Sequence, residues 1–281
     1  MGPKVWISVD MEGIGGLVDR RQFIPGEREY ERARAHMIAE MRTVVEAAWQ
    51  AGAGRVVVND SHDGQLNLAA DGLEGLPVQT ELISGMGKRF AMAEGLKGMD
   101  LALFVGYHAQ SGTARGVMDH TDSGDVFQVR LNGREVGEFG LNAFLAGFYG
   151  IPVGLVSGDD ALKVEVDRLI PDTETVVVKS ALGRQTARLP HPDRVHRELR
   201  RATRRAVTRF IAGTAPRPLS LTAPIRLCVS FMTTEGADTG LLYPGTTRID
   251  GRTVALACST MEQAYLAVRA LFLMGTGYPL V

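Results

Sequence analysis

The chain has 281 residues, of which 45% are hydrophobic and 22% charged, and its formal net charge is −1. This composition is typical of a globular protein, and the balanced charge argues against the excess of cations that binds nucleic acid or an anionic membrane. The sequence shows no apolar run approaching the ~20 residues of a membrane span, and no apolar segment typical of a secretory signal near its N-terminus. We therefore expect a cytoplasmic protein whose partners are neither nucleic acid nor membrane.

The first two thirds of the chain alternate short apolar runs with helical patterns. In the long helix, apolar residues recur at three- and four-residue steps, and Asn132-Gly133 is typical of a tight hairpin turn. The predicted elements, in chain order, are a strand at 4–9, a helix within 26–54, strands at 55–60 and 101–107, a hairpin at 126–138, a helix at 138–150, a strand at 151–158, a short helix ending at 169 and a strand at 175–179. Such alternation predicts an α/β fold with a mainly parallel sheet covered by helices on both faces.

The remaining residues have a different pattern. A helix near 194–209 carries an apolar stripe surrounded by arginines, and strands at 224–232 and 253–259 precede a closing helix at 261–275. We expect an α/β part over 1–185 and a C-terminal α+β part over 186–281 packed on it, unless the two form one continuous domain. The arginines would suit a nucleic-acid surface, but a solvated amphipathic helix fits the balanced net charge better.

Potential ligand residues follow the predicted strands at their carboxyl ends, where parallel α/β sheets place their sites. Asp10 and Glu12 follow the first strand on one face, His62 follows the second, His108 the third, and Glu138 follows the hairpin. Each residue alone has an ordinary interpretation as a hydrogen-bonded core or loop residue. Together they make the mixed oxygen and nitrogen set that zinc and similar divalent ions prefer.

The number of these ligands indicates more than one ion. Three carboxylates and two histidines exceed the usual requirement of one catalytic metal, whereas two ions ~3.5–4 Å apart that share a carboxylate would use them all. A buried pair such as Asp10 and Glu12 also needs a nearby positive charge. The sequence therefore favours a metal centre at the edge of the sheet.

The motifs SVDMEG, VNDSHDG, GYHAQ, GVMDH, VGEFGLNA and SGDD occur in this order. With them the chain resembles the DppA-type D-aminopeptidases, a family of binuclear zinc peptidases, over nearly its whole length. The resemblance implies that the 1–185 part is catalytic, that Asp10 bridges two zinc ions and that His120 is the catalytic residue. It further implies that Glu12 and His62 complete the first metal site and that His108 and Glu138 complete the second.

The implied function is hydrolysis of short peptides with N-terminal D-amino acids, such as D-Ala-D-Ala, by metal-activated water. The substrate ammonium needs an acidic partner, for which Asp159, Asp160 and Asp60 are candidates by charge alone. The family also implies a homo-oligomer, a decamer that encloses its active sites. Alternatives are a related binuclear metallo-amidohydrolase, a peptidase specific for L-residues, or a non-catalytic peptide-binding oligomer.

Overall fold

The structure, a computed structural model, describes residues 2–275. Its larger sheet has seven strands in the order β3-β2-β1-β4-β7-β8-β9, and all neighbouring strands are parallel except β8 and β9. The strands are β1 (Lys4–Val9), β2 (Arg55–Asp60), β3 (Thr80–Ile83), β4 (Leu101–Val105), β7 (Val153–Asp159), β8 (Glu174–Gly183) and β9 (Thr186–Arg188). The expected α/β fold with a mainly parallel sheet is confirmed.

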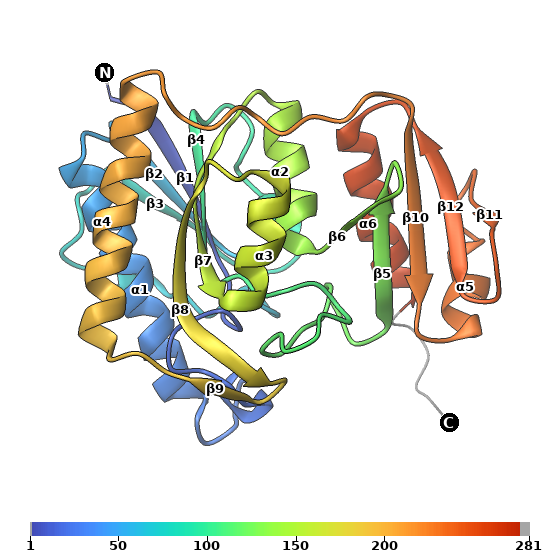
Figure 1. Cartoon of the computed structure of the whole chain (residues 1–281), viewed down its shortest axis with the longest axis horizontal. Helices are drawn as coiled ribbons and strands as arrows, with labels where there is room; N and C mark the ends of the chain where they lie inside the picture. Colours follow the sequence, from blue (N-terminus) through green and yellow to red (C-terminus); the bar gives the residue numbers. More distant parts are fainter. Residues whose placement is uncertain (1, 276–281) are drawn as a thin grey trace.

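Helices cover both faces of this sheet (Figure 1). Two apolar cores result, because successive side chains of the central strand β1 point to opposite faces. Val5 and Ile7 pack with Met37 and other apolar residues of α1 (Tyr30–Gln50), and with those of α4 (Pro192–Ile211). On the other face, Trp6 packs edge-on against Phe104 beneath α2 (Glu138–Phe148) and α3 (Asp160–Leu169). Full burial of each large side chain contributes ~2 kcal/mol to stability.

A second sheet of five antiparallel strands lies on the far side of α2 (Figure 1). Its order is β11-β12-β10-β5-β6, and α6 packs against β10, β12 and α2. Asn132 and Gly133 both have positive φ, as the predicted hairpin turn requires. The elements of this part are β5 (Val126–Leu131), β6 (Arg134–Val136), β10 (Ile225–Phe231), α5 (Thr234–Gly240), β11 (Thr247–Arg248), β12 (Thr253–Cys258) and α6 (Met261–Gly275).

The chain passes between the two sheets more than once. The β5–β6 hairpin precedes residue 185 but belongs to the second sheet, whereas α4 follows residue 185 and packs on the first sheet. Each sheet, with the helices packed on it, therefore draws on residues from both sides of position 185. No helix within residues 2–275 combines the length and the apolar composition that a membrane span requires.

The arginines of α4 lie around its buried stripe, and several of them pair with nearby groups. Arg205 forms an ion pair with Glu174 at 2.6 Å, and Arg209 donates to the carbonyl of Asp172 at 2.7 Å. Val195, Leu199 and the other apolar residues of the stripe pack into the core. The arrangement is that of a solvated amphipathic helix.

Candidate metal centre and active site

The order of three neighbouring strands brings the expected ligands together. Because β1 lies between β2 and β4, the residues that follow these strands meet at one edge of the sheet with Asp10 in the middle. His62 comes from the chain after β2, and His108 from the chain after β4. Glu138 arrives from a different direction, as the first residue of α2.

Asp10 directs its two carboxylate oxygens toward two different histidines. Its Oδ1 lies 3.4 Å from Nδ1 of His62, and its Oδ2 lies 3.5 Å from Nε2 of His108. Glu12 Oε2 lies 2.8 Å from the same His62 nitrogen, and Glu138 Oε2 lies 3.2 Å from the same His108 nitrogen. All five side chains are buried. The five expected metal ligands thus form one continuous cluster.

His120 joins the second half of the cluster. Its Nε2 lies 3.8 Å from Oε1 of Glu138, and its ring stacks on that of His108. Two groups of three have ligand atoms within 4.8 Å of one another and could each hold a metal ion, namely Asp10 with Glu12 and His62, and His108 with His120 and Glu138. In the second group, the geometry allows His120 to act either on a substrate or as a ligand.

Backbone carbonyls fix the orientation of all three rings. His62 Nε2 lies 2.9 Å from the carbonyl of Phe23, and Nδ1 of His108 and of His120 lie 3.1 and 2.7 Å from the carbonyls of Ala109 and Met118. A carbonyl only accepts, so these nitrogens carry the protons. When the rings are neutral, as metal binding requires, the opposite nitrogens direct lone pairs at the carboxylates, the orientation typical of metal-binding histidines. Without a metal, burial opposes a charge on His62 and His108, but the neighbouring carboxylates raise the pKa of both rings well above the usual value.

Such a set of facing acceptors needs a cation or a proton between its members. Asp10 Oδ2 and His108 Nε2 are buried and have no hydrogen-bond partner among the described residues. Burial and the adjacent charge of Glu12 raise the pKa of Asp10 to about 7, well above the usual range. Burial also opposes the charge on Glu12, but His62 holds the pKa of that carboxyl well below its ordinary value. Divalent ions bound between these groups would satisfy them, so the residues fit the implied zinc.

A cleft of about 720 Å³ opens onto this cluster and is lined by all six residues. Asp122 and Arg269 lie beside it, with Arg269 Nη1 3.3 Å from Asp122 Oδ1. The backbone N–H of Asp122 donates to Glu138 Oε1 at 2.7 Å, and burial raises the pKa of the Asp122 carboxyl to about 6. The sequence analysis did not single out these two residues, because no local motif links Asp122 to a helix 147 residues further along the chain.

The three acidic residues considered for the substrate ammonium lie elsewhere. Asp159 accepts from the N–H groups of Leu162 and Val117, Asp160 accepts from that of Ala181, and Asp60 accepts from Asn67 and Leu68. None of them lies among the residues that line the cleft.

Lys179 is a further residue that the sequence analysis did not single out. It is fully buried in the middle of β8, and its Nζ donates to the carbonyls of Glu12, Ile14 and Leu17, the last two at 2.9 and 2.6 Å. These bonds fold the chain after β1 into the loop that carries Glu12. A lysine that ends an apolar strand run, as in VVVK, is the local signal of such a contact.

A mainly parallel α/β sheet with a buried carboxylate–histidine cluster facing a cleft defines the class of metal-dependent hydrolases that the sequence indicated. The D-aminopeptidase family model (peptidase family M55) matches residues 3–270. The chain belongs to this family.

Two comparisons with individual proteins agree. A curated D-aminopeptidase of Bacillus subtilis (strain 168) is 38% identical over 269 residues, which are 94% of this chain and 95% of that protein. A solved structure, the Zn-dependent D-aminopeptidase DppA from Bacillus subtilis, described as a self-compartmentalizing protease, superposes with a TM-score of 0.93. It has 36% sequence identity, and the match covers 99% of this chain and 100% of that one. The relatives are thus hydrolases that act on peptides.

Proposed function

We propose that this protein is a zinc-dependent aminopeptidase that removes N-terminal D-amino acids from short peptides such as D-Ala-D-Ala. The observation that carries the proposal is the position of Asp10, whose two oxygens face two histidines on opposite sides. This is the geometry expected of a carboxylate shared by two ions. The zinc dependence and the activity of the relatives support the same conclusion.

The metal ligands proposed are the five that the resemblance implied. Asp10, Glu12 and His62 would hold one zinc ion, and Asp10, His108 and Glu138 would hold the other. When bound, zinc supplies Lewis acidity, which makes water a nucleophile near neutral pH and polarises a peptide carbonyl.

His120 is proposed to move the proton in this reaction. Its Nδ1–H is held by the Met118 carbonyl, so Nε2 is the atom that exchanges a proton at the cluster. Burial and the neighbouring His108 lower the pKa of His120, which keeps the ring neutral and able to accept a proton. The protonated ring can then donate to the amine that leaves.

Charged side chains in the cleft suit the two ends of a dipeptide. Besides the expected metal ligands, the cleft lining contains the carboxylates of Asp63 and Asp122. We propose Asp122 as the partner of the substrate ammonium, because its backbone N–H donates to Glu138 and so places it beside the metal cluster. Arg20, Arg184 and Arg269 line the same cleft and supply cations for a carboxylate. Asp122→Asn should therefore raise KM for a dipeptide more than it lowers kcat.

The proposal includes a homo-oligomer in the cytoplasm. The solved relative is described as self-compartmentalizing, and the homodecamer implied by the resemblance would enclose the clefts in the same way. Exposed apolar side chains near the second sheet, at Met232, Leu242 and Ile249, provide surface for such contacts. The free cysteines Cys228 and Cys258 are consistent with a reducing compartment. Sedimentation velocity of the native protein tests the assembly.

The deciding experiment measures product release from D-Ala-D-Ala and L-Ala-L-Ala, with zinc-loaded and chelator-stripped protein. Cleavage of the D-peptide alone, lost on stripping and restored by zinc, is the expected result. Cleavage of the L-peptide instead would identify an L-specific peptidase. Binding of both peptides without turnover by the zinc-loaded protein would contradict the aminopeptidase function.

A further inference from the structure

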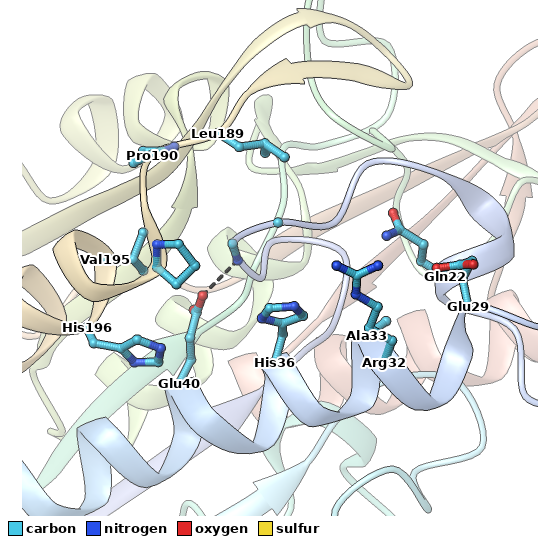
Figure 2. A pocket seen from close by; sticks show the side chains of 13 residues that line it. Gln22, Glu29, Arg32, Ala33, His36, Glu40, Leu189, Pro190, Val195 and His196 are labelled. Carbon is cyan, nitrogen blue, oxygen red and sulfur yellow. Dashed lines mark hydrogen bonds between the residues drawn. The ribbon is translucent and has the colours of Figure 1, made fainter.

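A second cavity, of about 320 Å³, lies on the side of α1 that faces the start of α4. Figure 2 shows Arg32, His36 and Glu40 rising from one side of α1 into this space, below the chain segment at Leu189 and Pro190. Gly15 and Gly16 form part of its wall, and they belong to the loop that carries the expected metal ligand Glu12. None of the six residues of the metal cluster lines this cavity.

Glu40 is the unusual residue of the cavity. Its side chain is almost completely buried, at 3% exposure, and its Oε1 accepts the backbone N–H of Gly15 at 2.8 Å. The other oxygen, Oε2, has no hydrogen-bond partner among the residues that the structure describes. The positive charge of Lys179 favours the ionised form of Glu40. Lys179 donates no hydrogen bond to it, however, because all three Nζ hydrogens are donated to backbone carbonyls. In the ionised carboxylate, a buried acceptor without a donor is costly, so Oε2 then calls for a donor from a ligand.

His196 offers a second acceptor in the same wall. The Thr43 hydroxyl donates its only proton to the carbonyl of Ala39, so it accepts from Nδ1–H of His196 at 2.8 Å. This leaves the lone pair of the neutral ring on Nε2. Burial, together with nearby Arg200, lowers the pKa of His196 and favours that neutral form. Two acceptors in one cavity wall match the several N–H groups of an ammonium.

Arg32 supplies the opposite charge in the same cavity. It precedes Glu40 by eight residues on α1, which places the two Cα atoms ~12 Å apart along the helix. No ion pair or hydrogen bond joins the side chain of Arg32 to the part of the chain that the structure describes. Its guanidinium is free to pair with a carboxylate, for which its fork of N–H groups is suited.

We propose that this cavity binds a small zwitterion, an amino acid or dipeptide, whose ammonium contacts Glu40 and His196 and whose carboxylate contacts Arg32. An extended dipeptide spans ~7 Å, a length that the long Arg32 side chain can match. The occupant would also contact the loop of Gly15, which leads directly to Glu12. Through this loop the bound zwitterion would change the activity of the metal centre. This effect on activity rests on the proposed function, but the binding of the zwitterion does not.

The test measures binding of D-alanine and L-alanine to the zinc-loaded full-length protein by calorimetry. Glu40→Gln keeps an acceptor for Gly15 but replaces the free oxygen with a donor, and Arg32→Gln removes the cation. Each should weaken the binding of at least one alanine by about tenfold or more. Ethylamine and propionate, which each carry one of the two charges, should bind more weakly than either alanine.

Two controls separate this cavity from the cleft. Glu31→Gln changes an exposed carboxylate of the same helix, paired with Arg34 at 3.7 Å, and should leave affinity unchanged. His120→Ala changes the cleft and should retain the binding that Glu40→Gln removes. Equal affinities in the parent and in folded Glu40→Gln protein would overturn the proposal. So would the absence of binding up to about 10 mM alanine.

A kinetic readout tests the connection to the metal centre. L-Alanine, which is not a product of the proposed reaction, should change kcat/KM for D-Ala-D-Ala hydrolysis in the parent and have no such effect in the Glu40→Gln variant. If the protein proves not to hydrolyse peptides, the calorimetric result still decides whether the cavity binds alanine. The two proposals therefore fail independently.

Discussion

The imidazole rings of His108 and His120 stack, with centroids 4.1 Å apart and planes inclined by 15°. Two charged rings at this distance would repel each other, so the pair accommodates one positive charge at most. Burial opposes a charge on His108, yet Glu138 and Asp10 raise its pKa well above the usual value. Burial and His108 lower the pKa of His120. The pKa values of the two histidines thus shift in opposite directions, and His120 is the one suited to exchange a proton with a substrate.

His120→Ala should separate these two roles. We expect kcat for D-Ala-D-Ala to fall by ~10²–10⁴, the usual contribution of a general acid–base group. The zinc content per subunit, measured by atomic absorption, should stay at the parental value. Loss of an ion in this variant would instead identify His120 as a ligand of the second site. His108→Ala is the matched control, because it should lose zinc as well as activity.

Because Asp10 lies between the two proposed zinc sites, its substitution should affect zinc binding differently from substitution of Glu12 or Glu138. Asp10→Asn should weaken both zinc sites, whereas Glu12→Gln and Glu138→Gln should each weaken one. Glu12 faces only His62 of the first site, and Glu138 faces only His108 and His120 on the side of the second. Removing a direct ligand should lower the affinity for zinc at least as much as the ~10–100-fold loss that is typical when a residue orienting a ligand is removed. Titration with a competing chelator measures these affinities. Parental affinity at both sites in Asp10→Asn would contradict the bridging role.

The sequence predicted the larger sheet and the ligand cluster because both depend on local patterns. Apolar runs and helical spacing located the strands, and strand ends located Asp10, His62 and His108. The short strand β3, the strand β9 and the helix α5 carry too few residues to show a period, so no strand or helix was predicted there. The strand order, which places Asp10 in the middle of the site, arises only when distant segments pair.

The residues that support the site were harder to predict for a related reason. Lys179 contacts carbonyls 162 to 167 residues earlier in the chain, and Asp122 meets Arg269 only after the second sheet has folded against the first. The VVVK pattern indicates that Lys179 is buried, but its carbonyl partners leave no trace in a side-chain pattern. Asp159 illustrates the reverse case, because its charge suggested a binding role, while its carboxylate caps α3 by accepting from Leu162 N–H.

Lys179→Met should destabilise the loop that carries Glu12. The variant removes three hydrogen bonds from a buried ammonium and leaves the carbonyls of Glu12, Ile14 and Leu17 without their donor. We expect a loss of about 3 kcal/mol or more in the free energy of unfolding, and weaker zinc binding at the site of Glu12. Urea unfolding and chelator titration measure the two effects.

Lys163→Met provides the matched control for this substitution. Lys163 is a partly exposed lysine whose Nζ pairs with Asp167 at 2.6 Å, one turn along α3. Its loss should change the free energy of unfolding by no more than about 0.5 kcal/mol. If Lys179→Met proved equally mild and kept parental zinc affinity, the three carbonyl contacts would not organise the loop.

Glu40 should make stability depend on pH in a defined window. Burial raises the pKa of its carboxyl from 4.5 to about 7 in the folded protein. Between these values the unfolded chain releases a proton that the folded chain retains, so the Glu40 contribution to stability falls as pH rises from about 4.5 to about 7. Above that range both states are ionised and the contribution is constant. The total decrease is about 3 kcal/mol at most.

Glu40→Gln removes this titration, so the difference between variant and parent isolates it. We expect the variant to gain stability relative to the parent across that window and then to keep a constant advantage up to pH 8. Urea unfolding of both proteins, without zinc and at half-unit steps of pH, measures the difference. Glu31→Gln, which alters an exposed carboxylate on the same helix, should show no comparable slope. A difference between Glu40→Gln and the parent that does not vary with pH would show that the buried carboxyl keeps its ordinary pKa, because only a shifted pKa couples this substitution to protons.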